Sequence, residues 1–250
     1  MKIGLITQWY PPEHGSAALP GTIAQALARA GHQVEVVTGF PNYPQGVLHE
    51  GWKQRWNQSE LVGDVRVHRT PIYVSHNDRA WQRMLNYISF ALSATVTSLR
   101  RLRSADVIWV HATPILPALP ALVLRRVVKI PYVLHIQDLW PDTVLASGML
   151  PAWLNGPART SLDWFCQMSY SHAATIGVTT PGMRTALVER AVPDCKIVDI
   201  PNWADEEVFR PVSDPDALGR DALGLPPGFV AMYAGAIGDV QGLETVVSAA

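Results

Sequence analysis

A histidine and an aspartate stand at the ends of two apolar runs that are typical of buried strands. His111 closes the run DVIWVH (106–111), and Asp138 follows YVLHI (132–136). Ligands of an open parallel sheet bind at the carboxyl ends of its strands, which is where both side chains are expected. The imidazole could bind a sugar hydroxyl or transfer a proton, and the carboxylate could orient a hydroxyl or act as a base. Two structural alternatives stay open: a strand-end core histidine, and a carboxylate that caps loop amides.

The first loop, QWYPPEHGSAALPG, predicts a place where backbone can approach a ligand. Gly15 and Ser16 precede a helical pattern, and their small side chains would let backbone N–H groups face a phosphate or a sugar. The alternative is a simple turn in which Ser16 caps the helix.

A second glycine-rich turn lies near the end of the sequence. Gly235 and Gly238 fall in GAIGDVQG, between the apolar run FVAMYAG and the helical pattern LETVVSAA. The spacing differs from G-x-G-x-x-G, but a strand before the turn and a helix after it favour a pyrophosphate at the helix N-terminus. Gln241 belongs to the same candidate donor site.

The sequence predicts neither a metal site nor a cofactor. Asp138 and Asp142 are four residues apart rather than in a D-x-D pair, and no histidine completes a cluster. Cys166 and Cys195 lie far apart without metal-ligand spacing, which indicates buried thiols in a reducing compartment. We therefore expect no metal and no resident cofactor.

Charge and hydropathy exclude other classes of protein. Twenty basic and 21 acidic residues give a formal charge of -1, which argues against a nucleic-acid partner. The sequence shows neither a secretory leader nor an apolar run of roughly 18 residues or more, so we expect a cytoplasmic protein.

Alternating short apolar runs and helical patterns predict an α/β fold, a doubly wound parallel sheet. The expected strands are 2–7, 33–39, 65–70, 106–111, 132–136, 175–180 and 196–200, and the expected helices are 17–31, 79–102, 115–128, 151–172 and 181–190. Residues 1–202 should form one Rossmann-like domain, 203–228 a linker, and 229–250 the first strand and helix of a second such domain.

The segment 79–103 predicts a long amphipathic helix. Its apolar residues recur at three-and-four spacing and a basic end follows: Trp81, Leu85, Ile88, Leu92, Val96 and Leu99, then Arg100, Arg101 and Arg103. We favour a crossover helix that packs these residues on the sheet; the alternative is a face resting on anionic lipid.

Six blocks, in this order, carry a resemblance to a known family: YPPEHGSAA, GHQVEVVTGFPNYPQG, DLWPD with ASGM, VTTPGMRTAL, IPNWADEEVFRP and YAGAIGDVQGLE. Together they resemble GT-B glycosyltransferases of family 4, and most of all the amino-sugar (fucosamine-type) transferases of bacterial surface-polysaccharide synthesis. The resemblance implies two Rossmann-like domains, an acceptor-side N-terminal one and a C-terminal one that binds a nucleotide-sugar. The second would be truncated here.

The resemblance also implies roles for individual residues. Gly15 resembles a glycine near the donor phosphates, His111 a histidine near the transferred sugar, and Asp138 the aspartate of the DLWP block. Where many members carry arginine and lysine in the first C-terminal turn, this chain has Ala236 and Gln241. The remaining candidates are Ser16, Gly235 and Gly238 for donor phosphate, and Glu13, His14, Trp140 and Asn202 for the acceptor cleft.

The implied reaction is a retaining, metal-independent transfer of a sugar from a nucleotide donor, expected to be UDP-linked, to a lipid-linked or polysaccharide acceptor. Such an acceptor would bring the protein to the inner face of the membrane as a peripheral protein. We expect the 250 residues alone to be inactive. Two alternatives stay open: a non-catalytic acceptor-binding or scaffold subunit whose donor half is a separate chain, and a sugar-nucleotide epimerase of the same fold.

Overall fold

The computed structural model describes residues 1–75, 80–146, 155–204, 210, 224–225, 230–235 and 241–249. The chain divides into two compact units, Met1–Pro201 and Asn202–Ala250. The second unit has one described helix, α7 (Glu244–Ala249).

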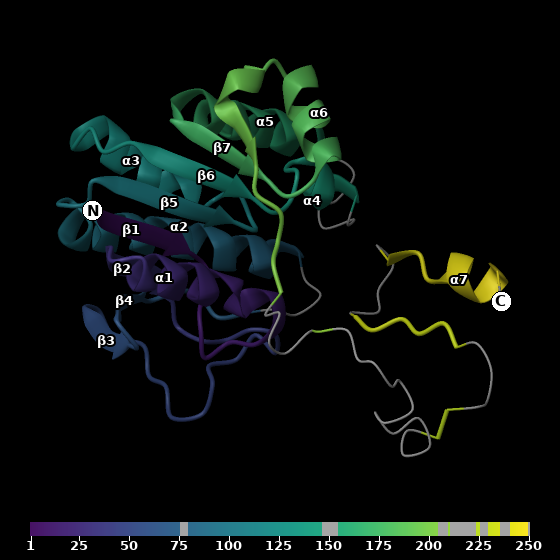
Figure 1. Cartoon of the computed structure of the whole chain (residues 1–250), viewed down its shortest axis with the longest axis horizontal. Helices are drawn as coiled ribbons and strands as arrows, with labels where there is room; N and C mark the ends of the chain where they lie inside the picture. The colour runs from purple at the N-terminus through teal and green to yellow at the C-terminus, as the bar shows by residue number, and fades with distance from the viewer. Residues whose placement is uncertain are drawn as a thin grey trace. The chain divides into compact units, whose positions relative to one another are not determined.

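The first unit is built on an eight-stranded sheet in the order β3-β4-β2-β1-β5-β6-β7-β8 (Figure 1). All neighbouring pairs are parallel except β3 and β4. The strands are β1 (Lys2–Thr7), β2 (Gln33–Gly39), β3 (Gln58–Val62), β4 (Val65–Thr70), β5 (Val107–Ala112), β6 (Tyr132–Ile136), β7 (Thr175–Val178) and β8 (Ile197–Asp199). The predicted α/β fold with a mostly parallel sheet is confirmed.

Helices cover both faces of this sheet. They are α1 (Leu19–Arg29), α2 (Ala80–Arg101), α3 (Ala118–Val127), α4 (Asp142–Ala146), α5 (Asn155–His172) and α6 (Pro181–Glu189), with short 3-10 turns at Gly15–Ala18 and Asp194–Lys196. Both α1 and α2 pack on β2 and β4, α1 in front of the sheet and α2 behind it in Figure 1. Helix α2 also packs against α3, and α3 against α5. The central strands are therefore buried on both sides, as their continuous apolar runs predict.

Two details differ from the expected strands. Strand β3 was not predicted, because QSELV alternates half-buried and exposed residues without an apolar run. It pairs antiparallel at the sheet edge, where a short polar strand is tolerated. The expected strand at 229–235 is wrong for its described part, because 230–235 have no strand structure. A strand is stable only within a sheet, and the eight-stranded sheet does not include 230–235.

The predicted orientation of the long helix is also wrong. Trp81, Leu85, Ile88, Leu92 and Val96 are exposed. The residues of α2 that are buried are small or polar, apart from two aromatic ones: Asn86, Tyr87, Phe90, Ala91, Ser93, Ala94, Thr97 and Ser98. The side of α2 with these small and polar side chains packs on β2 and β4, and the apolar stripe lies on its outer side. Among the described helices, none combines the length and hydropathy that a bilayer span requires.

Candidate active site in the first unit

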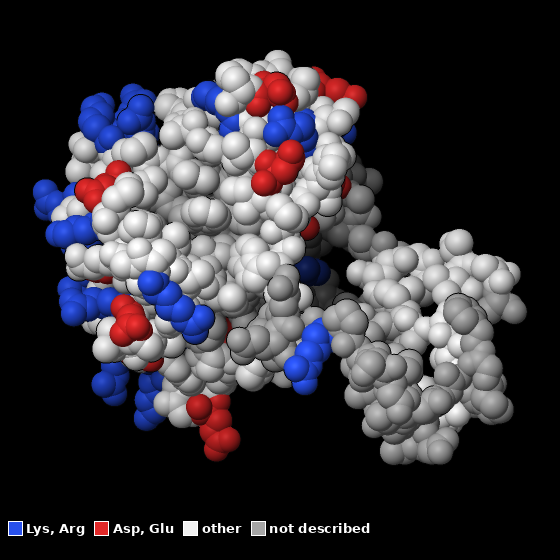
Figure 2. Space-filling view, viewed as in Figure 1, with Lys and Arg blue, Asp and Glu red and all other residues white. Residues whose placement is uncertain are grey.

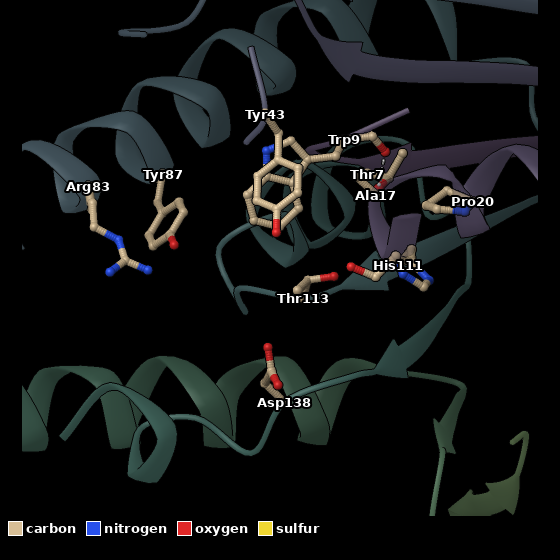
Figure 3. A pocket seen from close by; sticks show the side chains of 11 residues that line it. Thr7, Trp9, Ala17, Pro20, Tyr43, Arg83, Tyr87, His111, Thr113 and Asp138 are labelled. Carbon is tan, nitrogen blue, oxygen red and sulfur yellow. Dashed lines mark hydrogen bonds between the residues drawn. The ribbon is translucent and has the colours of Figure 1, made fainter. Parts of the chain in front are cut away.

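A cavity of about 210 Å³ lies at the carboxyl ends of β1, β5 and β6. Strand β1 has β2 on one side and β5 on the other, so the cavity lies where the strand order reverses, the usual ligand position in open α/β sheets. Figure 3 shows Arg83 and Tyr87 on one side of the cavity, His111 on the opposite side, Asp138 below, and Thr113 between them. The lining residues are Thr7, Trp9, Ser16, Ala17, Pro20, Tyr43, Arg83, Tyr87, His111, Thr113 and Asp138.

His111 is a neutral imidazole in the wall of this cavity. The side chain is 3% exposed, and burial, followed by the neighbouring His135, lowers its pKa to about 3. The two rings meet edge to face with centroids 5.5 Å apart, and Nε2 of His135 donates to the carbonyl of Ile200 at 3.1 Å. Nδ1 of His111 is buried without a hydrogen-bond partner. His111 can therefore offer a hydrogen bond to a ligand, but it cannot act as an acid near neutral pH.

The low pKa of His111 makes the stability of the fold sensitive to acid. Its folded-state pKa lies below its unfolded value, so its stabilising effect is complete above about pH 6.5 and is lost as the pH falls toward the folded value. The free energy of unfolding should fall by up to about 1.4 kcal/mol per pH unit on this account. We expect His111→Gln to flatten that slope in urea titrations made at decreasing pH. The exposed His14→Gln should leave it unchanged, and an equal slope in all three proteins would contradict the assignment.

Asp138 presents a carboxyl group to the cavity from the loop after β6. Burial raises its pKa above the ordinary aspartate value. The loop is held by backbone bonds from Trp140 N to the carbonyl of Asp138 at 3.1 Å and from Thr143 N to that of Leu139 at 3.0 Å. Helix α4 then begins at Asp142. The carboxyl group thus has a fixed position and a raised proton affinity, as a group that accepts a hydroxyl proton requires.

Arg83 and Tyr87, one turn apart on α2, are site residues that the sequence analysis missed. Nε of Arg83 is buried without a hydrogen-bond partner. Burial raises the pKa of Tyr87, and the charge of Arg83 opposes that rise. Asn86 fixes the helix, because its Oδ1 accepts from Gln8 Nε2 at 2.5 Å and its Nδ2 donates to the carbonyl of Tyr73 at 2.6 Å. One feature of the sequence could have indicated these residues: an arginine in the first turn of a helix that starts near the carboxyl end of a strand.

Aromatic rings form one wall of the cavity. Trp9 lies 5.2 Å from Tyr43 and 6.4 Å from Tyr87, and Tyr87 lies 6.0 Å from Trp140, measured between ring centroids. Trp9, Tyr43 and Tyr87 line the cavity, whereas Trp140 is buried behind it. Flat apolar rings beside charged and hydroxyl groups suit a ligand such as a sugar, which has both polar edges and C–H faces.

Glu13 is a buried residue that supports the loops around the cavity and does not line the cavity itself. Its side chain is 2% exposed and accepts three backbone N–H groups, from Tyr10 through Oε2 and from Asn42 and Tyr43 through Oε1, each at 2.9 Å. Burial raises its pKa, and these hydrogen bonds act in the opposite direction. Glu13 therefore ties the loop after β1 to the loop after β2. Its predicted place in the acceptor cleft is corrected to that of a buried anchor.

The structure brings together some of the predicted residues and separates others. His111, Asp138 and Ser16 line the same cavity. Gly15, with φ +66°, and His14 are exposed in the same loop and do not line it. Trp140 and Glu13 are buried outside it. Asn202, Gly235 and Gln241 lie in the second unit, and Gly238 falls outside the described residues.

Among the residues that the structure describes, no three His, Cys, Asp or Glu side chains are grouped so that they could hold a metal ion. Both cysteines are free thiols; Cys166 is buried as predicted, whereas the prediction is wrong for Cys195, which is exposed in the short turn Asp194–Lys196.

Comparison with known proteins gives a consistent result. The family model described as "Glycosyl transferase 4-like domain" matches residues 15–203. The chain is 30% identical over 254 residues to a putative colanic acid biosynthesis glycosyl transferase, WcaI, of Escherichia coli K12, and spans 62% of its length. It is 27% identical over 175 residues to a probable glycosyltransferase, WbjE, of Pseudomonas aeruginosa; that match covers 70% of this chain and 43% of WbjE.

Solved structures share the fold at low sequence identity. Anabaena HepE, in complex with UDP and glucose, gives a TM-score of 0.55 at 13% identity over 90% of this chain and 50% of HepE. Sucrose-phosphate synthase of Thermosynechococcus elongatus gives 0.57 at 17% identity over 90% of this chain and 53% of that enzyme. These similarities show a GT-B-type fold.

Proposed function

Because the chain belongs to the glycosyl transferase 4-like family, we propose that its first unit is the acceptor side of a glycosyltransferase for cell-surface polysaccharide. The transferred sugar comes from a nucleotide donor, UDP-linked, and goes to a lipid-linked or polysaccharide acceptor. The reaction retains the anomeric configuration and uses no metal. The chain spans 62% of the length of WcaI. The proposed activity is therefore assigned to the whole protein and not to these 250 residues alone.

One observation carries the proposal: a cation and a carboxylate share one cavity at the switch point of the sheet. Arg83 and Asp138 both line it, with the hydroxyl of Thr113 and the imidazole of His111 beside them. A guanidinium binds phosphate oxygens, and a carboxylate accepts a hydrogen bond from a sugar hydroxyl. The cavity thus has a guanidinium for the diphosphate and a carboxylate for a hydroxyl of a sugar that is carried on this diphosphate.

The donor is assigned to the second unit by analogy. HepE, which shares the fold, binds UDP and glucose, and the family resemblance gives nucleotide-sugar binding to the C-terminal domain. Gly235, Gly238 and Gln241 are the proposed phosphate contacts of the second unit, and Gly15 and Ser16 are those that the resemblance implies for the first. In the absence of a metal, backbone amides and a helix dipole would stabilise the departing diphosphate. The amino-sugar, fucosamine-type specificity remains part of this proposal.

A transfer assay tests the proposed function. The polypeptide encoded by the whole open reading frame is incubated with radiolabelled UDP-sugars and a bacterial lipid extract, with and without a metal chelator. We expect label in the lipid fraction in both cases. Free epimerised nucleotide-sugar would instead establish the epimerase alternative. Tight acceptor binding without transfer by the complete polypeptide would establish a scaffold subunit.

Replacing Arg83 should weaken acceptor binding selectively. A charge-assisted contact to phosphate contributes about 1.5–3 kcal/mol, so Arg83→Gln should raise KM for a diphosphate-linked acceptor by about 10- to 100-fold. Arg83→Lys should restore part of the loss, because it keeps the charge without the forked geometry. Steady-state kinetics with each substrate varied in turn measure the effect. The exposed Arg66→Gln is the control. A rise in KM for the nucleotide-sugar alone would contradict the assignment of Arg83 to the acceptor.

A further inference from the structure

Helix α2 exposes an apolar stripe that the described residues leave uncovered. Trp81 and Leu92 are 59% and 58% exposed, and Leu85, Ile88 and Val96 are 39–42% exposed. These five residues recur at three-and-four spacing, so they lie along one side of the helix. The opposite side, which packs on β2 and β4, contains Asn86, Ser93, Thr97 and Ser98. The outer face of α2 is therefore more apolar than much of its inner face.

The surroundings of the stripe are basic. From residue 80 to residue 137 the chain has seven Lys or Arg residues and a single acidic residue, Asp106. Its carboxylate accepts a hydrogen bond from the backbone N of Lys2 at 2.7 Å. The seven are Arg83, Arg100, Arg101, Arg103, Arg125, Arg126 and Lys129. All but Arg83 lie at or just after the carboxyl-terminal ends of α2 and α3, which pack side by side. Figure 2 shows Lys and Arg gathered along the edge of the first unit where the N-terminus lies.

We propose that α2 docks on an anionic lipid bilayer, with the stripe from Trp81 to Val96 in the interface and the arginines at its end on lipid headgroups. An amphipathic helix with a tryptophan and leucines on one face, and with cations beside them, is suited to lie in the plane of a membrane. Charge favours this occupant over a second copy of the chain, because lipid headgroups supply the negative charge that the basic cluster lacks, whereas the same face of a second copy does not.

Docking on α2 would hold the cavity about one helix diameter, roughly 10 Å, from the lipid surface. Arg83 and Tyr87 line the cavity from the side of α2 that lies opposite to Trp81, Leu85 and Ile88 of the stripe. An acceptor anchored by a lipid tail could then present its diphosphate to Arg83 without leaving the membrane. This step rests on the proposed function, whereas lipid binding by α2 does not.

Vesicle sedimentation with the 250-residue chain tests the inference. We expect the chain to sediment with vesicles of phosphatidylcholine and phosphatidylglycerol, to stay in the supernatant with phosphatidylcholine alone, and to be released by high salt. The double variant Ile88→Gln/Leu92→Gln should lower the partition coefficient by at least about tenfold. The matched control is Leu61→Gln, at an apolar residue 70% exposed on the edge strand β3, and it should bind as the wild type does.

Two double variants that each remove two positive charges distinguish electrostatic docking from non-specific adhesion. Arg100→Gln/Arg103→Gln should weaken binding to the anionic vesicles, by about fivefold for each residue, while Lys53→Gln/Arg55→Gln, at exposed residues before β3, should not. Circular dichroism melts confirm that every variant is folded.

Two outcomes would overturn the proposal: equal losses of vesicle binding in test and control variants, or no vesicle binding by the wild type. A concentration-dependent dimer in analytical ultracentrifugation that Ile88→Gln/Leu92→Gln abolishes would assign the stripe to self-association instead. None of these readouts involves a nucleotide-sugar, so they are independent of the transfer assay.

Discussion

Replacing Glu13 by alanine should lower the free energy of unfolding of the first unit by about 3 kcal/mol or more, because it leaves three buried backbone N–H groups without an acceptor. Each of these groups, on Tyr10, Asn42 and Tyr43, bonds to the carboxylate at 2.9 Å. An unpaired buried donor costs about 1–3 kcal/mol. Few single substitutions in a surface loop lower the free energy of unfolding by this amount.

A graded series makes the interpretation specific. Glu13→Gln keeps the Oε1 carbonyl, which can still accept from Asn42 and Tyr43, but turns an amide N–H₂ toward the N–H of Tyr10. We therefore expect an intermediate loss for Glu13→Gln in urea denaturation, and almost none for the exposed Glu50→Ala. If the glutamine variant were as unstable as the alanine variant, the negative charge of Glu13 would matter more than its two oxygen acceptors.

The Glu13 anchor also links stability to the site. Tyr43 is held through its backbone by Glu13 and lies against Trp9 in the aromatic wall. Arg69, which is buried, donates from Nη1 to the carbonyl of Gly39 at 3.2 Å and from Nη2 to that of Pro11, so it ties the same two loops together from the other side. Two buried charged side chains thus fix the loops after β1 and β2, and the cavity wall depends on both.

The sheet and part of the site could be predicted because they follow from local patterns. Buried parallel strands are continuous apolar runs, and the residues that follow them share one edge, so His111 and Asp138 were placed correctly from their strands alone. Arg83 and Tyr87 were not, because their presence in the cavity depends on how α2 crosses the sheet. The side-chain bond between Gln8 and Asn86, 78 residues apart, holds that arrangement, and no local pattern encodes it.

Two errors have the same physical origin. The apolar stripe of α2 was expected to face the sheet because apolar side chains are usually buried. Where α2 packs on β2 and β4, the buried residues instead include Ala91, Ala94 and Ser98. Glu13 was expected in the cleft because of the family resemblance, yet two of the three backbone groups that it binds, those of Asn42 and Tyr43, lie 29 and 30 residues away in the sequence. Both outcomes depend on tertiary contacts.

Replacing Asp138 by asparagine should reduce kcat for sugar transfer by about 10²- to 10⁴-fold, the usual effect of removing a group that accepts a proton in the transition state. Asparagine keeps the size of the side chain and can still contact a hydroxyl, but it cannot take its proton. KM for the acceptor should change little. The measurement is steady-state transfer by the polypeptide of the whole open reading frame, with Asp142→Asn on the neighbouring exposed carboxylate as the control.

The raised pKa of Asp138 adds two expectations that a passive residue would not meet. Transfer should decline as the pH falls through that raised value, so the acid limb of kcat should lie above the ordinary aspartate range and disappear in Asp138→Asn. The fold, in contrast, should gain from the substitution. The folded-state pKa exceeds the unfolded one, so ionisation of Asp138 destabilises the folded state as the pH rises, and the neutral asparagine removes this cost at neutral pH. A variant that is less active and at least as stable is the signature of a carboxylate kept buried for function. A variant that loses stability while keeping its activity would show that Asp138 only caps its loop.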